Sequence, residues 1–107
     1  SMGGAQALVI GLGHPDRFAR VASFSTGTFD PAWVAEALAR PETLNDRLAT
    51  LWIGCGRDDS YFASNQRIAE VLAARGVRHT FVAREGDHDW RTWRAFLMSA
   101  LPLLVPG

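Results

Sequence analysis

Residues 48–55, LATLWIGC, form a nearly unbroken apolar run and decide the fold of this chain. A run of this length and composition is typical of a parallel strand that helices cover on both faces. Two flanking segments also predict strands: residues 18–24 (FARVASF) are short and apolar, and residues 77–83 (VRHTFVA) alternate between polar and apolar side chains. We therefore expect three strands, with the apolar run as the best buried of them.

Helices are predicted before, between and after these strands. Their segments are residues 1–11, a stretch that starts at Asp30 and Pro31, residues 61–75, and a final helix from Asp89. Asp30 suits the N-cap, and Pro31 suits the first helical position, where its missing N–H costs nothing. Gly76 follows the third segment, where glycine commonly ends a helix.

The final helix carries apolar residues at helical spacing. This spacing predicts one buried stripe along the helix, formed by Trp90, Trp93, Leu97, Ala100 and Leu101. Pro102 is expected to kink or end this helix, since proline donates no backbone hydrogen bond.

Three strands alternating with four helices predict an α/β fold. The order begins with a helix, as does the carboxyl half of a doubly wound, mostly parallel sheet. We expect residues 1–107 to be the carboxyl-terminal part of a single domain, with the other half upstream of residue 1.

Composition narrows the function. Eleven basic residues balance eleven acidic ones, so no net field draws the chain to nucleic acid or an anionic membrane. No apolar run reaches the roughly 18 residues that a bilayer crossing needs. The single cysteine, Cys55, excludes an intrachain disulfide and a Cys-rich metal site. The compartment stays open, because a signal peptide would lie before residue 1.

The first five residues, Ser1-Met2-Gly3-Gly4-Ala5, contain the second half of a G-x-S-x-G nucleophile elbow. In this motif a serine sits on a tight strand-to-helix turn, and the flanking glycines avoid collisions between a Cβ and the neighbouring elements. The alternative interpretation is a cloning remnant followed by a flexible glycine leader. The elbow hypothesis makes Ser1 a candidate nucleophile.

Two polar turns follow the second and third predicted strands. They read GRDDS at residues 56–60 and EGDHDW at residues 85–90. Open α/β sheets place their sites at the carboxyl ends of strands. Acyl transfer by a serine needs a base and an orienting carboxylate, and the order Ser, acid, His is that of α/β-hydrolases. A metal site is disfavoured, because the adjacent side chains of residues 87–89 cannot converge on one ion.

The segments SMGGAQAL, HPDRF, GRDDS and EGDHDWRTW resemble the esterase family of α/β-hydrolases that includes feruloyl and acetylxylan esterases, enterochelin-type siderophore esterases and the esterase-D group. The resemblance runs over nearly the whole chain and implies the carboxyl half of that fold. It implies Asp59 as the triad acid, with Asp58 as the alternative, and His88 as the catalytic base. In this fold the amide after the nucleophile is an oxyanion donor, which here is the backbone amide of Met2. Trp90 is a candidate substrate contact, because it is the tryptophan nearest His88. Asp59 also suits a helix cap, which is compatible with a triad role.

The resemblance implies a carboxylic-ester hydrolase that needs neither metal nor organic cofactor. The expected substrate is a small-molecule or carbohydrate-linked ester, and no nucleic acid or membrane partner is expected. Serine peptidases of the prolyl-oligopeptidase type and acyltransferases resembling mycolyltransferases remain alternatives on the same fold. An inactive fragment that acts as an assembly module is a further alternative. We expect the open sheet to pair with the missing amino-terminal half or with a second copy.

Overall fold

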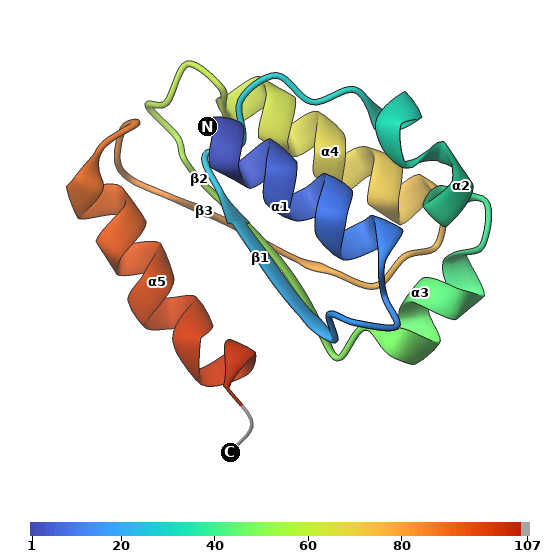
Figure 1. Cartoon of the computed structure of the whole chain (residues 1–107). Coiled ribbons are helices and arrows are strands. Elements are labelled where there is room, and N and C mark those ends of the chain that lie inside the picture. Colours follow the sequence, from blue (N-terminus) through green and yellow to red (C-terminus); the bar gives the residue numbers. More distant parts are fainter. Residues whose placement is uncertain (106–107) are drawn as a thin grey trace.

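The computed structural model describes residues 1–105, which fold around three parallel strands (Figure 1). The strands are β1 (Arg20–Phe24), β2 (Thr50–Gly56) and β3 (Thr80–Arg84), in the spatial order β1-β2-β3. β2 pairs with both neighbours and is buried from residue 51 to residue 56. The predicted α/β class is confirmed, and the apolar run forms the best buried of the three strands, as expected. The outer strands begin two and three residues later than predicted.

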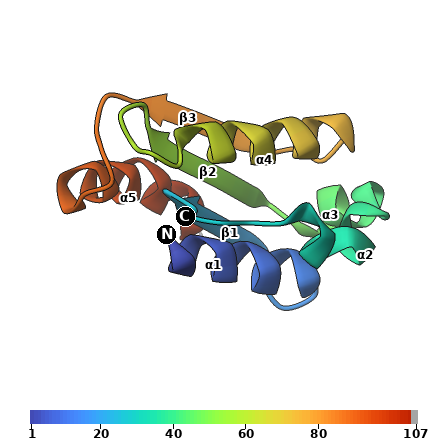
Figure 2. The same cartoon turned by 90° about the horizontal axis from the view of Figure 1, so that it is seen from above.

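Helices cover both faces of this sheet (Figure 2). Helices α1 (Met2–Gly13) and α4 (Phe62–Ala74) lie on one face, and α5 (Trp90–Leu104) lies on the other. Alternate residues of β2 point to opposite faces, as strand geometry dictates. Ile53 therefore joins the core under α1 and α4, whereas Trp52 packs with Phe96 of α5.

Close packing of α1 on β1 depends on small residues. A Cβ on Gly11 would lie 2.6 Å from Val21 Cγ2, and a Cβ on Gly4 would lie 2.6 Å from Thr26 Oγ1. Both glycines thus let the helix approach the strand and the loop that follows it. Gly4 lies in the first turn of α1, so this approach fixes the position of the start of the helix.

The segment after Asp30 differs from the single helix predicted. It forms a 3-10 helix (Pro31–Val34), α2 (Ala35–Leu38) and α3 (Pro41–Arg47). The described residues thus hold five α-helices and one 3-10 helix rather than four helices. The cap prediction is correct, because Asp30 Oδ1 accepts a hydrogen bond from the Ala32 amide at 2.9 Å. Pro41 divides the segment, since a residue before proline is disfavoured in helical geometry.

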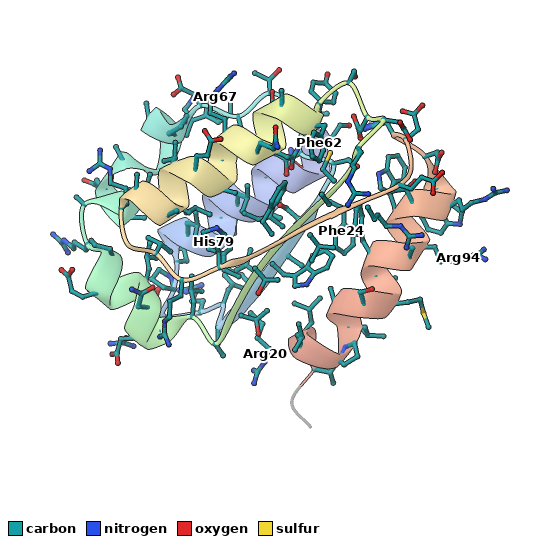
Figure 3. The ribbon with its side chains drawn as sticks, turned by 180° about the vertical axis from the view of Figure 1, so that it is seen from behind. Arg20, Phe24, Phe62, Arg67, His79 and Arg94 are labelled. Atoms are coloured by element: carbon teal, nitrogen blue, oxygen red, sulfur yellow. The ribbon has the colours of Figure 1, made fainter. Side chains whose placement is uncertain are left out.

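The buried stripe of α5 also differs from the prediction. Thr92, Phe96 and Ala100 are buried, whereas Leu97 and Leu101 are 42% and 45% exposed. Figure 3 shows Phe24 between the sheet and α5. The centroids of the Phe24 and Phe96 rings are 5.8 Å apart.

Pro102 does not end α5, which continues to Leu104. Its missing N–H affects only the last turn, where it leaves the carbonyl of the exposed Met98 without a helical partner. Among the described residues, no helix has both the length and the apolar character needed to span a membrane.

Candidate active site

The predicted site residues gather at one end of the sheet. The amino terminus and the loops that follow β2 and β3 lie at this end (Figure 1). Because β1, β2 and β3 are parallel, their carboxyl ends meet there. The start of α1 adds Ser1 to the same region, since its carbonyl accepts a hydrogen bond from Gly27, just after β1, at 2.9 Å.

Asp59 occupies a tight turn between β2 and α4. Its Oδ1 accepts a hydrogen bond from the Tyr61 amide at 2.8 Å, which closes an Asx turn. The carboxylate is fully buried. Burial opposes ionisation, but hydrogen bonds from Tyr61, His88 and Ser25 outweigh it and hold the pKa of Asp59 below its ordinary value. The carboxylate is therefore a fixed, buried negative charge at neutral pH.

His88 lies opposite this carboxylate. Its Nδ1 is 2.8 Å from Asp59 Oδ2, and its side chain is 29% exposed. The imidazole meets the Trp93 ring edge-on at 5.0 Å. A histidine whose Nδ1–H is held by a carboxylate leaves Nε2 as the free acceptor, which is the tautomer a general base requires.

Asp58 connects the two turns instead of facing His88. The Asp58 amide donates to Gly86 O at 2.9 Å, and its carboxylate accepts from the Gly86 amide at 3.3 Å. The Arg57 amide donates in the same way to Arg84 O at 2.8 Å. A Cβ on Gly56 would collide with Gly86 O, so the two turns touch through backbone. Of the two aspartates, the structure brings Asp59 to the histidine.

Ser1 precedes the first turn of α1. Its carbonyl also accepts a weaker hydrogen bond from the Ala5 amide at 3.4 Å. Met2, the first helical residue, has an amide with no acceptor within the helix, as at every helix start. Within the described residues, the Ser1 hydroxyl and His88 form no hydrogen bond, so the structure joins acid and base but leaves the serine apart.

Asn65 is a buried polar residue that the sequence analysis missed. Its amide oxygen accepts from the Thr26 amide at 3.3 Å, and its Nδ2 donates to Thr26 O and Tyr61 O at 2.9 Å each. These bonds tie the loop that carries Gly27 to the turn that carries Asp59. Asparagine inside a helical pattern gave no signal for this role, because the pattern does not reveal which loop lies opposite.

Ser25 and Trp93 form a second polar contact that the sequence analysis missed. The Trp93 indole N–H donates to Ser25 Oγ at 2.8 Å. Ser25 is fully buried, and its hydroxyl is one of the groups that lower the pKa of Asp59. Trp93 was expected to be mainly a core anchor. Its spacing along α5 predicted a buried position, whereas the residue is half-buried, and the spacing carried no information about the indole nitrogen.

A cavity of about 540 Å³ opens beside Ser1. Its lining is mainly apolar and includes Ile10 of α1, Trp33 and Tyr61. Trp90 lies outside this lining, and its side chain is 66% exposed at the start of α5. In the part of the chain described, no group of three or more His, Cys, Asp or Glu side chains is placed to hold a metal ion.

Solved structures share this arrangement of elements. A ferulic acid esterase matches with a TM-score of 0.80 and 25% sequence identity over 97% of this chain and 48% of its own. S-formylglutathione hydrolase (FrmB) from Staphylococcus aureus matches with a TM-score of 0.78 and 21% identity, over 98% of this chain and 49% of its own. FphF, a fluorophosphonate-binding serine hydrolase from the same organism, matches with a TM-score of 0.78 and 22% identity, over 99% and 52%. At 21% and 22% identity, the similarity to the two Staphylococcus aureus structures shows a shared fold and nothing further.

Sequence comparison agrees with the structural matches. An acetyl esterase from Caldicellulosiruptor saccharolyticus is 30% identical over 50 residues, which are 47% of this chain and 19% of that protein. The chain thus spans about half the length of the solved structures and less of the acetyl esterase. Residues 1–104 match the family described as "Putative esterase". Because this match takes in nearly all 107 residues, the chain belongs to that esterase family.

Proposed function

We propose that the protein carrying this chain is a serine hydrolase of carboxylic esters, with Ser1, Asp59 and His88 as its triad. The observation that carries the proposal is the 2.8 Å contact between His88 Nδ1 and the buried Asp59 carboxylate, at the sheet end where Ser1 precedes α1. Membership of the esterase family supports the same chemistry.

The proposed reaction has two halves. His88 Nε2 takes the proton of the Ser1 hydroxyl while its oxygen attacks the ester carbonyl, and the Met2 amide donates to the resulting oxyanion. The protonated imidazole then gives its proton to the departing alcohol, which leaves an acyl-enzyme. Water, activated by the same imidazole, attacks the acyl-enzyme and releases the acid and Ser1. Asp59 holds the imidazole tautomer throughout. Catalytic hydrogen bonds are often loose before substrate binds, so the separation of Ser1 from His88 is compatible with this route.

Two variants test the nucleophile and the base. In the full-length polypeptide, Ser1→Ala and His88→Ala should each remove most turnover of p-nitrophenyl acetate, because triad members act as a unit. Ser99→Ala and His14→Ala are the matched controls, since both side chains are exposed and neither belongs to the site. Normal turnover by Ser1→Ala would refute the proposal.

The acid is tested by comparing two neighbouring aspartates. Asp59→Asn should lower kcat by about 10³–10⁴, as loss of the correct tautomer does in triads. Asp58→Asn should cost far less, because Asp58 contacts the Gly86 amide rather than the imidazole. A larger loss in Asp58→Asn would transfer the role to Asp58.

The apolar cavity beside Ser1 supports an ester with an apolar acyl or alcohol group. A direct rate comparison of an aryl acetate, a feruloyl ester and a proline-containing peptide amide separates an esterase from a peptidase on this fold. We expect both esters to be cleaved faster than the amide. Faster cleavage of the amide would contradict the esterase assignment, and transfer of the acyl group to an added alcohol in preference to water would indicate an acyltransferase.

We further propose that the chain is the carboxyl part of one α/β-hydrolase domain and that the amino-terminal part covers the open edge of β1. Among residues 1–105, β1 pairs only with β2, and Phe18, beside the free edge of β1, is 44% exposed. An unpaired apolar edge invites association. Light scattering should therefore find the 107-residue segment alone associated or poorly soluble, and the full-length polypeptide monodisperse. A defined dimer of both would favour a second copy, and a monodisperse monomeric segment would contradict the proposal.

A further inference from the structure

We propose that Asn65 of α4 is a positioning residue that sets the place of Ser1 relative to the acid and the base. The inference rests on the proposed function. The Asn65 side chain is fully buried and makes hydrogen bonds to Thr26 and Tyr61. Thr26 belongs to the loop that holds Ser1, and Tyr61 belongs to the turn that holds Asp59.

The loop after β1 contacts the start of α1 at two points. The Gly27 amide donates a hydrogen bond to Ser1 O at 2.9 Å. One residue earlier, Thr26 lies against the first turn of α1, since a Cβ on Gly4 would be 3.0 Å from Thr26 Cα. The position of the peptide unit between Thr26 and Gly27 therefore determines where the backbone of Ser1 lies.

Asn65 holds Thr26 through both backbone polar groups of that residue. Asn65 Oδ1 accepts from the Thr26 amide at 3.3 Å, and Asn65 Nδ2 donates to Thr26 O at 2.9 Å. The second proton of Nδ2 goes to Tyr61 O at 2.9 Å. Exchanging the oxygen and nitrogen of this side chain would place Nδ2 against an N–H and the oxygen against two carbonyls. The three bonds therefore define a single orientation of the Asn65 amide.

The same side chain is anchored on the side of the acid. Tyr61 O also accepts from the backbone amide of Asn65 at 3.0 Å, and the Tyr61 amide donates to Asp59 Oδ1 at 2.8 Å. Asp59 Oδ2 in turn lies 2.8 Å from His88 Nδ1. Asn65 thus joins the loop that holds the nucleophile to the turn that holds the acid, whereas the contact between acid and base does not pass through Asn65.

This arrangement makes Asn65 important for the distance between nucleophile and base. Attack on an ester requires the Ser1 hydroxyl within hydrogen-bond reach of the imidazole, and a misplacement of about 1 Å can lower the rate about a hundredfold. Truncation of Asn65 frees the loop after β1 from the turn after β2. We therefore expect slower attack by Ser1 while the contact between Asp59 and His88 stays intact.

Two variants of the full-length polypeptide test the inference. Asn65→Ala removes all three side-chain bonds. Asn65→Ser is milder, because a helical serine hydroxyl can donate to the carbonyl four residues earlier, here Tyr61 O, while the bonds to Thr26 are lost. Each variant should lower kcat for p-nitrophenyl acetate by about ten- to a hundredfold at nearly unchanged KM. Wild-type kcat in both variants would overturn the inference.

A control variant separates placement from stability. Leu44→Ala truncates a buried core residue of α3, at the opposite end of the sheet (Figure 1), so it destabilises the fold without touching the site. It should keep wild-type kcat at a temperature where circular dichroism and urea unfolding show all variants to be folded. An equal loss of kcat in Leu44→Ala and Asn65→Ala would overturn the inference, because the loss would then follow stability.

Proton NMR gives a second readout that does not depend on turnover. The Gly27 amide proton should move upfield in both Asn65 variants, since its hydrogen bond to Ser1 O weakens when the loop is released. The downfield His88 Nδ1–H resonance should stay unchanged, because Asp59 still holds it. An unchanged Gly27 resonance would overturn the inference. Loss of the His88 resonance would also overturn it, because Asn65 would then act on the acid–base pair and not on the nucleophile.

The positioning role and the triad fail in different ways. If Ser1→Ala removes turnover while both Asn65 variants keep wild-type kcat, the positioning role is wrong and the triad stands. If Ser1→Ala keeps turnover, the triad is wrong, and the Gly27 resonance still decides whether Asn65 holds the loop. Asn65→Ser supplies both readouts should Asn65→Ala fail to fold.

Discussion

Asn65→Ala is expected to destabilise the protein far more than an average polar substitution in a helix. Asn65 is fully buried and is bonded to the amide and the carbonyl of Thr26, which is itself fully buried. Truncation leaves both Thr26 groups without these partners, at about 1–2 kcal/mol each. Tyr61 O keeps its helical bond from the Asn65 amide, so it adds little. We expect a loss of about 2–4 kcal/mol in the free energy of unfolding.

The assay is urea unfolding of the full-length polypeptide, followed by circular dichroism and by tryptophan fluorescence. Asn45→Ala is a matched control, because Asn45 also lies in a helix and also makes two side-chain hydrogen bonds, to Gly76 O and from the Arg78 amide. Those bonds are exposed to water, so the control should lose about 1 kcal/mol or less. Equal losses in the two variants would refute the argument that burial of the Thr26 groups sets the cost.

Three further predictions concern the start of α1, Asp59 and Cys55. Gly4→Ala should destabilise by about 1–3 kcal/mol in urea unfolding, because its Cβ would lie 2.6 Å from Thr26 Oγ1; Gly3→Ala, with no neighbour within 4 Å, should be neutral or stabilising. The pKa of Asp59 is lowered in the folded state, so its contribution to stability is complete above its ordinary pKa of about 4 and is lost as the pH falls through the folded value. The difference in unfolding free energy between wild type and Asp59→Asn should therefore shrink below about pH 4, and a pH-independent difference would contradict this. Burial, with the nearby Asp59 charge, raises the pKa of the Cys55 thiol to about 12, so a thiol reagent at pH 8 should label it slowly until urea unfolds the chain. Rapid labelling of the folded protein would show that the thiol is accessible.

The central features of the fold were readable from sequence because they depend on long apolar runs and on chain order. The apolar side chains of residues 48–55 are shielded from water only if both faces of the strand are buried, and this segment forms the middle strand. The turns after β2 and β3 were expected to meet because parallel neighbours end together, and Asp59 and His88 do meet. The choice of Asp59 over Asp58 rested on the family resemblance, and the Asx turn at Tyr61 supplies the physical reason.

Features that depend on which neighbour lies opposite were not readable. Phe96 and Leu97 are adjacent apolar residues, and helical spacing allowed either to face the sheet; Phe96 is buried and Leu97 is exposed. The partner of the Trp93 indole, Ser25, lies 68 residues away in sequence. Contacts of this kind arise only once the sheet has assembled, so the bond between Trp93 and Ser25 had no local signature in the sequence.

The backbone bonds between the turns after β2 and β3 make the acid and the base one mechanical unit. The Arg57 amide binds the end of β3 and the Asp58 amide binds the turn after it, whereas Ser1 is held by Gly27 on a different loop. In hydrogen exchange, the Arg57 and Asp58 amides should consequently open together in one cooperative event, separate from the opening of Gly27. Any rearrangement that brings Ser1 to the imidazole then moves the start of α1 and the Gly27 loop relative to the paired turns after β2 and β3. The free-energy cost of that movement lies in the contacts between these two parts and not in the alignment of Asp59 with His88.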